Sequence, residues 1–482
     1  MPAVASDVIL GRVLIAAWVL LGCVSAAHAV MYKRDPRSAT IWVVISFALP
    51  IIGPWLYWAL GINRVRRRAS QERRWAGRPV DRPALTIVHP TPDPADEAIA
   101  HLAPLRNVAD RVTHLPLLPG NRVEPLHNGE QAYPRMLDSI ASAERTVTLA
   151  SYVFDWDDVG RSFAEALEQA ARRGVKVHIL VDGVGALGHF SRMGRLLMQC
   201  KVEVAAFFPL RFPFGRFRLN LRNHRKILVV DGRVGFTGGM NISQRYLVTR
   251  PAPGRVEDLH FEVQGPVVAE LQHTFVEDWA LATNRVLMGE EYFPELSPAG
   301  PALCRGIASG PDEDLERVYW ILLAALTTAQ RSVRIVTPYF VPTLSLITAM
   351  GTAALRGVDV TLVLPSTVDR PFMRWVADAY LWQLLERGVK VVRRPPPFVH
   401  TKLLIVDEQW LLIGSANLDP RSFRLNFELN VEVYAAELGG RLSRWLDALV
   451  DTSQRVTLNE MDSRPPWRRL RDGLAKLASP YL

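Results

Sequence analysis

Long apolar runs occupy the start of the chain, before any alternation of apolar and polar positions begins. Residues 13–30 carry no charged side chain, and a second uncharged run extends from Ala39 to Ile62. Each run is close to the roughly 20 residues that an α-helix needs to cross the hydrocarbon core of a bilayer. The pattern predicts a transmembrane helical hairpin, with spans at about 10–30 and 39–62.

Two features of these runs leave alternatives open. Pro50, Gly53 and Pro54 interrupt the second run, and membrane helices tolerate such residues where neighbours satisfy the freed backbone groups. A kinked or partly re-entrant segment is therefore an alternative to a straight span. Ala27-His-Ala29 could be a signal-peptidase site. Only Arg12 precedes the first run, however, and a second run follows at once, which favours an uncleaved hairpin.

Basic residues follow the second run directly. Seven arginines lie between Arg64 and Arg78, with Glu72 as the one acidic residue among them. Because basic residues are retained on the cytoplasmic side of a membrane, this cluster predicts that the rest of the chain is cytoplasmic. Lys33, Arg34 and Arg37, between the two runs, argue more weakly for the opposite orientation.

From Asn121 onward, strand-like and helix-like patterns alternate. Residues 146–154 and 175–182 predict strands, residues 160–173 predict a helix, and the same order returns in residues 332–364. Such alternation predicts the α/β class, as two halves with mostly parallel sheets that form one composite site. The expected domains are the membrane hairpin 1–64, a basic segment and linker 65–120, the first half 121–290, a linker 291–314, and the second half with a basic tail 315–482.

One short motif occurs twice and carries the candidate chemistry. His224-Arg-Lys226-Ile-Leu-Val-Val-Asp231 is echoed 176 positions later by His400-Thr-Lys402-Leu-Leu-Ile-Val-Asp407, and Asn241 matches Asn417 at the same offset. Two collinear copies argue against accident, although a duplicated strand-turn-strand with surface His and Lys would give the same letters. Only seven of the 57 basic residues are lysines. Lysine in both motifs therefore suggests a need for a compact point charge.

Two histidines and two lysines can process a phosphodiester without a metal or another cofactor. A neutral imidazole attacks phosphorus and gives a phosphohistidine, while a protonated one donates to the leaving alkoxide and later deprotonates the acceptor. Lys226 and Lys402 would stabilise the non-bridging oxygens as charge develops. The sequence contains no Walker-type glycine loop and no dense carboxylate cluster for magnesium, so we expect no cofactor.

The paired motifs resemble those of the phospholipase D superfamily, and three segments resemble bacterial cardiolipin synthases in particular. These segments are Asn223 to Gly232, Thr337-Pro-Tyr-Phe-Val-Pro342, and Gly414 to Glu428. The resemblance extends from the N-terminal apolar hairpin to about residue 455. Arg393-Arg-Pro-Pro-Pro397 departs from the pattern, because such enzymes usually carry aromatic and glycine residues there. The departure concerns the acceptor side and not the chemistry.

The resemblance implies an activity and assigns roles to ten residues. One phosphatidylglycerol would donate its phosphatidyl group to His224, and a second would accept it, giving cardiolipin and glycerol. Asp231 and Asp407 end strands before turns, a position that favours tying the loop over touching phosphate. The implied site comprises catalytic His224, Lys226, Asp231, His400, Lys402 and Asp407, phosphate-binding Asn241 and Asn417, and histidine-orienting Asp258 and Glu428.

The same motifs also serve phospholipase D hydrolases, other phosphatidyltransferases and metal-free nucleases. The net charge of +9 suits anionic lipid and nucleic acid alike. A nuclease rarely needs two membrane spans, so we expect an anionic phospholipid partner, a membrane, and no nucleic acid. Three cysteines without paired spacing fit a reducing compartment. The expected location is the bacterial inner membrane, multi-pass, with the catalytic part cytoplasmic. The sequence leaves the acceptor, hydrolysis versus transfer, and the oligomeric state open.

Overall fold

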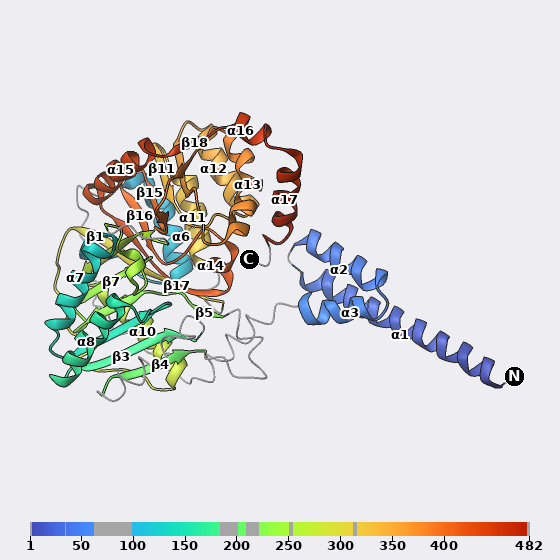
Figure 1. Cartoon of the computed structure of the whole chain (residues 1–482), viewed down its shortest axis with the longest axis horizontal. Coiled ribbons are helices and arrows are strands. Elements are labelled where there is room, and N and C mark those ends of the chain that lie inside the picture. Colours follow the sequence, from blue (N-terminus) through green and yellow to red (C-terminus); the bar gives the residue numbers. More distant parts are fainter. Residues whose placement is uncertain are drawn as a thin grey trace. The chain divides into compact units, whose positions relative to one another are not determined.

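The computed structural model divides the chain into two compact units, Met1–Arg68 and Ala69–Leu482 (Figure 1). It describes residues 2–33, 35–61, 99–183, 201–208, 221–249, 254–311 and 316–479. The arginine-rich stretch after the apolar runs and the first part of the expected linker lie outside these residues.

The first unit contains one long helix beside a broken segment. Helix α1 (Pro2–Tyr32) includes Gly11–Tyr32, the only helix in the described residues that is long and apolar enough to cross a membrane. The expected second span instead forms α2 (Pro36–Ala48), α3 (Ile52–Leu56) and the π-helical turn η1 (Tyr57–Gly61). Pro50 lies in the break, where its missing N–H and its ring oppose helix continuation. The second apolar run is therefore not one continuous helix.

The second unit is built on one large sheet. Among the described residues its strand order is β18-β13-β12-β11-β15-β16-β17-β10-β1-β9-β7-β6-β2-β3-β4, with β5 also pairing with β17. Strands β10 and β1 meet in the middle, so the sheet passes continuously from one half to the other. The strands of the first half are β1 (Leu118–His127), β2 (Thr146–Ser151), β3 (Lys176–Asp182), β4 (Glu203–Phe207), β5 (Arg222–Asn223), β6 (Ile227–Val230), β7 (Val234–Gly238), β8 (Val256–Glu257) and β9 (Leu259–Gln264). Those of the second half are β10 (Ala302–Ser309), β11 (Ser332–Val336), β12 (Asp359–Pro365), β13 (Lys390–Arg394), β14 (Phe398–Val399), β15 (Leu403–Val406), β16 (Trp410–Gly414), β17 (Asn426–Tyr434) and β18 (Gln454–Val456).

The α/β class is confirmed, but the sheet is mixed and not mostly parallel. Strands β2, β3 and β4 run parallel, as do β11, β12 and β13. The motif strands β6 and β15 instead pair antiparallel with β7 and β16 through three-residue loops, 231–233 and 407–409, each of which begins with a turn closed by a backbone hydrogen bond. The central residues of these turns, Asp231-Gly232 and Asp407-Glu408, all have positive φ, as a type I′ turn requires. A turn this tight reverses the chain, whereas parallel neighbours need a long crossover.

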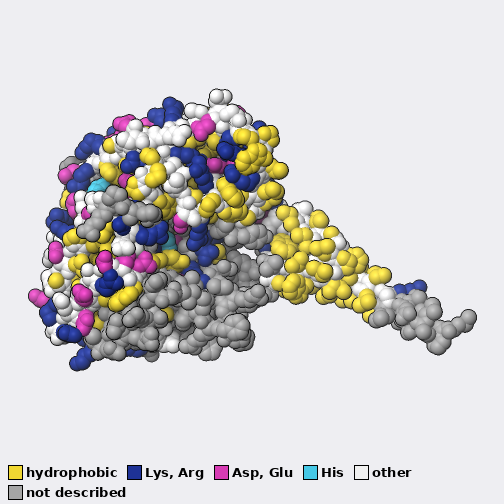
Figure 2. All heavy atoms as spheres, in the orientation of Figure 1, with side chains coloured by type: hydrophobic (Ala, Val, Ile, Leu, Met, Phe, Trp, Pro, Cys, Tyr) yellow, Lys and Arg dark blue, Asp and Glu magenta, His cyan; other side chains and the backbone are white. Residues whose placement is uncertain are grey.

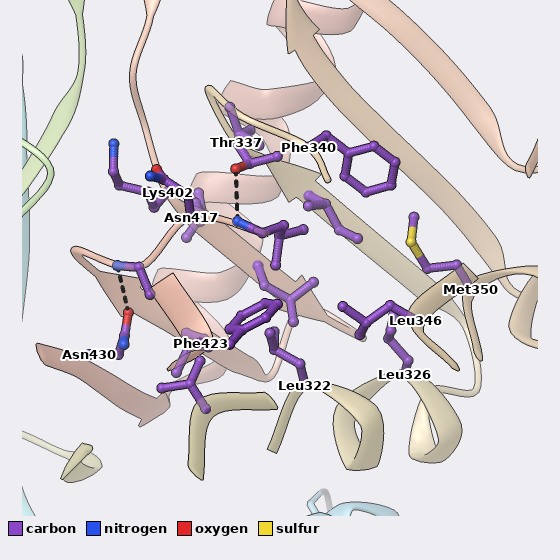
Figure 3. A pocket seen from close by; sticks show the side chains of 18 residues that line it. Leu322, Leu326, Thr337, Phe340, Leu346, Met350, Lys402, Asn417, Phe423 and Asn430 are labelled. Carbon is purple, nitrogen blue, oxygen red and sulfur yellow. Dashed lines mark hydrogen bonds between the residues drawn. The ribbon is translucent and has the colours of Figure 1, made fainter. Parts of the chain in front are cut away.

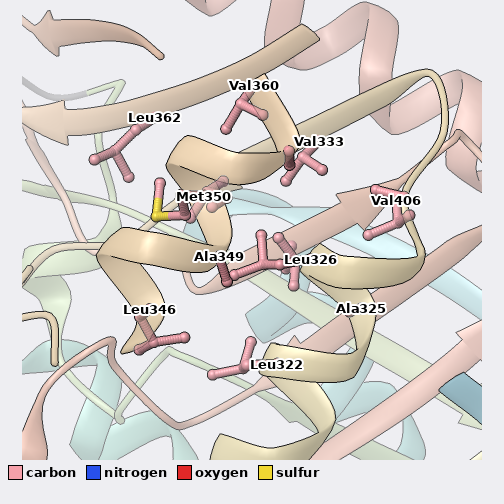
Figure 4. Close-up of a cluster of buried hydrophobic side chains, with 14 of the residues drawn as sticks. Leu322, Ala325, Leu326, Val333, Leu346, Ala349, Met350, Val360, Leu362 and Val406 are labelled. Atoms are coloured by element: carbon pink, nitrogen blue, oxygen red, sulfur yellow. The ribbon is translucent and has the colours of Figure 1, made fainter. Parts of the chain in front are cut away.

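Each half has its own hydrophobic core between helices and sheet. In the first half, Phe163, Ile179 and Phe236 are fully buried together. In the second half, the apolar faces of two helices meet the sheet around Met350 and Leu362 (Figure 4). The helices are η2 (Ala100–Leu102), α6 (Ala103–Thr113), α7 (Asn128–Ala141), α8 (Asp158–Arg172), η4 (Gln244–Tyr246), α10 (Val268–Thr283), α11 (Arg317–Thr328), α12 (Leu344–Leu355), α13 (Pro371–Leu385), α14 (Pro420–Arg424), α15 (Ala436–Asp451), α16 (Leu458–Asp462) and α17 (Pro466–Leu477).

Two stretches expected as linkers belong to the folded unit. Helix α6, within the expected linker 65–120, buries Leu105 and Ala109 completely in the core of the second half. Strand β10, within the expected linker 291–314, pairs with both β1 and β17. The Pro-rich and Ala-rich composition of residues 79–120 therefore did not reveal the short amphipathic helix α6. Strand β10 connects the two halves of the sheet.

The motif aspartates hold the turns to the strands beside them. Asp407 accepts hydrogen bonds from three consecutive backbone N–H groups, residues 330–332, at 2.7–3.0 Å, and contacts His101 Nε2 at 2.9 Å. Asp231 accepts from residues 144–146 at the same range of distances. Burial alone would raise the pKa of Asp407, but the backbone hydrogen bonds outweigh it and lower the pKa. Both carboxylates therefore serve the fold directly.

We expect Asp407→Ala to lower the free energy of unfolding by about 2–4 kcal/mol, because three backbone donors lose a charged acceptor. Thermal unfolding in detergent measures the loss. Since the folded pKa lies below the unfolded value, the contribution of Asp407 is present above the unfolded pKa and disappears as pH falls through the folded pKa. Glu408→Gly, in the same turn, is the matched control and should stay within about 1 kcal/mol, because glycine suits positive φ. Equal stability of Asp407→Ala and the parent would contradict the assignment.

Candidate active site

The backbone around His224 is held by the other half of the second unit. Strand β5, directly before His224, pairs in parallel with β17, and the N–H of His224 donates to the carbonyl of Phe427 at 2.9 Å. The next residue, Arg225, is fully buried and reaches across as well, donating from Nε to the carbonyl of Glu428 at 3.0 Å. Its guanidinium also pairs with Asp278 at 2.5 Å. The first motif is thus anchored on β17, the strand of the second half that carries Glu428.

The backbone around His400 is held in the mirrored way. Strand β14, directly before His400, pairs in parallel with β8 of the first half. The N–H of His400 donates to the carbonyl of Glu257 at 2.7 Å. Each motif histidine therefore follows a short strand that belongs, by pairing, to the opposite half.

The side chains repeat this exchange. His224 Nδ1 lies 2.9 Å from Glu428 Oε2, and His400 Nδ1 lies 2.8 Å from Asp258 Oδ2. Both carboxylate side chains are fully buried, whereas the imidazoles are 12–13% exposed. Each imidazole is thus held by the acid that follows the other motif. Sequence reasoning selected both acids but did not establish this crossed pairing.

Both carboxylates are ionised, and this fixes the imidazole tautomers. Burial would raise the pKa of Glu428, but the contacts with His224 and Lys226 outweigh it, so the pKa is lowered. Burial acts in the same way on Asp258, and the hydrogen bond from His400 outweighs it. Because an ionised carboxylate only accepts hydrogen bonds, Nδ1 of each imidazole carries the proton. The Nε2 atoms are left to react.

The two motif lysines lie against the motif histidines and are poorly solvated. Lys226 Nζ donates to the carbonyl of His224 at 2.7 Å and stands 5.4 Å from the ring centre of Tyr152. Lys402 Nζ lies 2.9 and 3.1 Å from the two ring nitrogens of His400. Burial lowers the pKa of Lys226 to about 7 and that of Lys402 to about 8. Burial, then the Lys402 charge, lower the pKa of His400 to about 4.

The two motif asparagines are not equivalent. Asn241 Oδ1 accepts from the N–H of Val153, and its Nδ2 donates to the hydroxyl of Tyr246, both at 3.1 Å. Asn417 Oδ1, in contrast, is buried without a hydrogen-bond partner among the described residues. The side chain of Asn241 is therefore committed to the protein, whereas the amide of Asn417 is available to a ligand.

Small cavities lie behind the motif lysines. Lys402 and Asn417 line one of about 30 Å³ whose remaining wall is mostly apolar, including Leu322, Phe340 and Met350 (Figure 3). Lys226 lines a cavity of about 10 Å³ in the corresponding place of the first half. Such volumes hold only a water molecule or two. These cavities are therefore too small to be the substrate-binding site.

The structure brings eight of the ten predicted site residues into these paired clusters. Asp231 and Asp407 lie at the far ends of β6 and β15 from the histidines and bond the turns described above. The sequence analysis did not identify Arg225 as a site residue. The one indication in the sequence is that a charged residue lies between His224 and Lys226, whereas Thr401 holds the same position in the second motif. It also missed Tyr152 and Tyr246, whose rings lie 5.2 Å from His224 and 6.3 Å from His400.

Comparison with known proteins gives matches over nearly the whole chain. The family described as "Cardiolipin synthase, PLD-like domain" matches residues 136–279 and 322–450, and "Phospholipase_D-nuclease N-terminal" matches residues 14–61. Cardiolipin synthase A of Pseudomonas putida is 33% identical, covering 96% of both chains. The major cardiolipin synthase ClsA of Bacillus subtilis is 30% identical, covering 93% of this chain and 95% of its own.

A solved structure shares the fold. The phosphatidylserine synthase of Haemophilus influenzae superimposes with a TM-score of 0.61 at 14% sequence identity. The match covers 78% of this chain and all of that one. At this identity the similarity concerns the arrangement of strands and helices.

We expect Lys226 to lose its proton near pH 7 and Lys402 near pH 8, because burial disfavours their charged forms. Competitive acetylation across pH, with the modified peptides quantified by mass spectrometry, measures both midpoints. The exposed Lys176 reports the intrinsic reactivity of the reagent. In Glu428→Gln the midpoint of Lys226 should fall further, since the Glu428 charge raises this pKa. Midpoints near the ordinary value of 10.5 would refute the buried, low-pKa assignment.

Proposed function

Since the chain belongs to the phospholipase D-like cardiolipin synthase family, we propose that it transfers a phosphatidyl group between two phosphatidylglycerol molecules, giving cardiolipin and glycerol. The crossed imidazole–carboxylate pairs carry this proposal. They give two imidazoles with reactive Nε2 atoms beside two lysines, which is the equipment that a two-step phosphoryl transfer needs.

In the first step, His224 Nε2 attacks the phosphorus of the donor lipid. A nitrogen–phosphorus bond forms, the bond from phosphorus to the glycerol headgroup oxygen breaks, and His400 gives that oxygen a proton. The low pKa of His400 leaves this imidazole neutral in the free enzyme at neutral pH. A phosphodiester anion beside it favours the charged form, so substrate binding itself would load the proton that the leaving group takes.

In the second step, neutral His400 removes the proton from a hydroxyl of the second phosphatidylglycerol. The resulting alkoxide attacks phosphorus, the bond to His224 breaks and cardiolipin leaves. His400 then holds a proton, as it did in the donor complex, and releases it to solvent when the anionic lipid departs. Lys226 and Lys402 hold the non-bridging oxygens in both steps, and the amide N–H groups of Asn417 would donate to the same oxygens. Glu428 and Asp258 act as positioning residues that keep Nε2 of each imidazole free. Asp231 and Asp407 act through the fold.

The protein is membrane-associated, with a lipid substrate. We place it in the bacterial inner membrane with the catalytic unit in the cytoplasm, where the arginine-rich stretch after residue 62 would be retained. Helix α17 supports contact with the bilayer surface, because Trp467, Leu470 and Leu474 are each more than half exposed on it (Figure 2). Basic residues flank this face, as in interfacial helices on anionic lipid. We assign no nucleic-acid partner.

Purified full-length protein should convert labelled phosphatidylglycerol into cardiolipin and glycerol in equal amounts, and EDTA should leave the rate unchanged. The four basic side chains supply the positive charge in this scheme. Thin-layer chromatography separates the products, and added alcohols or phosphatidylethanolamine probe the acceptor. Phosphatidic acid as the main product would mean hydrolysis and would overturn transfer. Loss in EDTA with recovery on adding a divalent ion would overturn the metal-free scheme.

We expect His400→Ala to lose on the order of 10²–10⁴-fold in rate, because it removes the proton donor. It should still form a phosphohistidine at His224 from a lipid with an activated leaving group. His224→Ala should form no adduct, and His114→Asn, an exposed histidine at the end of α6, should match the parent. Peptide mapping of the trapped label decides the roles, and label on His400 in the parent would reverse them.

A further inference from the structure

Residues 36–61 extend along α1 and then turn back, so that both ends of the segment lie near Lys33. At the beginning of this segment, the ammonium of Lys33 lies over the ring of Trp42, 6.0 Å from its centre. At its end, the carbonyl of Gly61 accepts a hydrogen bond from the same Lys33. Tyr57 likewise meets His28, with 2.6 Å between the hydroxyl and Nδ1. Both ends of the segment therefore lie beside the C-terminal end of α1.

The segment reaches only halfway along the membrane-length part of α1. Phe47, next to the end of α2, packs on Gly22, where an added Cβ would lie 3.0 Å from its ring. Gly22 is midway between Gly11 and Tyr32, so the segment rises about 15 Å at 1.5 Å per residue. That rise is half of the ~30 Å hydrocarbon thickness. A complete second crossing would have brought the segment close to Gly11.

Two N–H groups of the reversal are satisfied within the turn itself. The N–H groups of Ile52 and Gly53 donate to the carbonyls of Pro50 and Leu49, at 2.6 and 2.8 Å. Pro50 has no N–H to satisfy. A Cβ on Gly53 would lie 2.0 Å from the carbonyl of Ile45, so only glycine permits the close approach of α3 to α2. Non-helical backbone within a membrane must be satisfied inside the protein, and these two hydrogen bonds contribute to that.

The other half of α1 extends beyond this turn without a neighbouring segment in the described residues. Val13, Ile15 and Leu20 are 58–65% exposed there, and all are aliphatic. Figures 1 and 2 show this half of α1 projecting alone from the first unit, covered by hydrophobic side chains. Exposed aliphatic side chains around a single helix match lipid as the neighbour.

We infer that α1 is the single crossing in this unit and that residues 36–61 form a re-entrant segment within one leaflet. The start of α1 and the chain after Gly61 then lie on opposite faces of the membrane. This arrangement removes a conflict in the charge pattern, because Lys33, Arg37 and the arginines from Arg64 onward fall on one face. A two-span hairpin would separate them. With the catalytic unit cytoplasmic, as proposed above, the first residues of α1 are extracytoplasmic.

The geometry also gives the anchor a tapered cross-section. Three helical segments fill the leaflet on the catalytic side, whereas α1 alone passes through the other leaflet. In the hairpin alternative both leaflets would hold two helices. The N-terminal unit would thus occupy more area in one leaflet than in the other.

Cysteine accessibility in the full-length chain tests the inference. Cys23, Cys200 and Cys304 are replaced by Ser or Ala, and single cysteines are introduced by Ala5→Cys, Asp35→Cys and Asn63→Cys. A membrane-impermeant maleimide is applied to spheroplasts before and after lysis. We expect Ala5→Cys to react in intact spheroplasts, and Asp35→Cys and Asn63→Cys to react only after lysis.

The alternatives give different labelling patterns. Reaction of Asp35→Cys alone in intact spheroplasts would establish the two-span hairpin and overturn the inference. Labelling of all three positions only after lysis would mean that α1 does not cross, and would overturn it too. Cardiolipin formation by each variant, measured separately, shows that the chain is folded. Because labelling does not depend on turnover, failure of the proposed activity and failure of this topology are distinguishable.

Discussion

The crossed hydrogen bonds between each motif histidine and the carboxylate of the opposite half are the constraint on which the site depends. Glu428 and Asp258 are fully buried carboxylates, and a buried charge is tolerated only where it is paired and hydrogen-bonded. Each finds that pairing across the interface, His224 for one and His400 for the other. Neither motif histidine pairs with the carboxylate of its own half. The two halves must dock before either imidazole has a defined tautomer.

The backbone enforces the same dependence. The short strands β5 and β14 pair with β17 and β8 of the opposite half, and each leads directly into a motif histidine. Arg225 adds a buried link from the first motif to the carbonyl of Glu428 and to Asp278. Position and charge are thus set together, which is how a site keeps reactive groups pre-organised for phosphoryl transfer.

The two halves are copies in sequence but not in electrostatics. The second motif has Thr401 in place of Arg225, and Asn417 retains an unsatisfied oxygen where Asn241 does not. Lys226 and Lys402 each donate to the carbonyl of their own motif histidine, and Lys402 also lies against both ring nitrogens of His400. A two-step transfer needs different tasks from its two histidines, and these differences give each imidazole its own surroundings.

Local pattern determined the α/β class, the two motifs and the long apolar helix, because each depends on spacing within a few turns or strands, whereas the acids Asp258 and Glu428 were predicted from the family resemblance. Tertiary structure decided which acid holds which imidazole, since Glu428 and His224 are 204 residues apart and only docking of the halves brings them together. It also decided that α6 and β10 belong to the folded unit and that the sheet is mixed. The reversal of residues 36–61 was an open alternative in the sequence. The contacts of Lys33 with Gly61 and of Phe47 with Gly22 favour the reversal. Apolar composition shows how many residues can lie in lipid, but it does not show where the chain turns back.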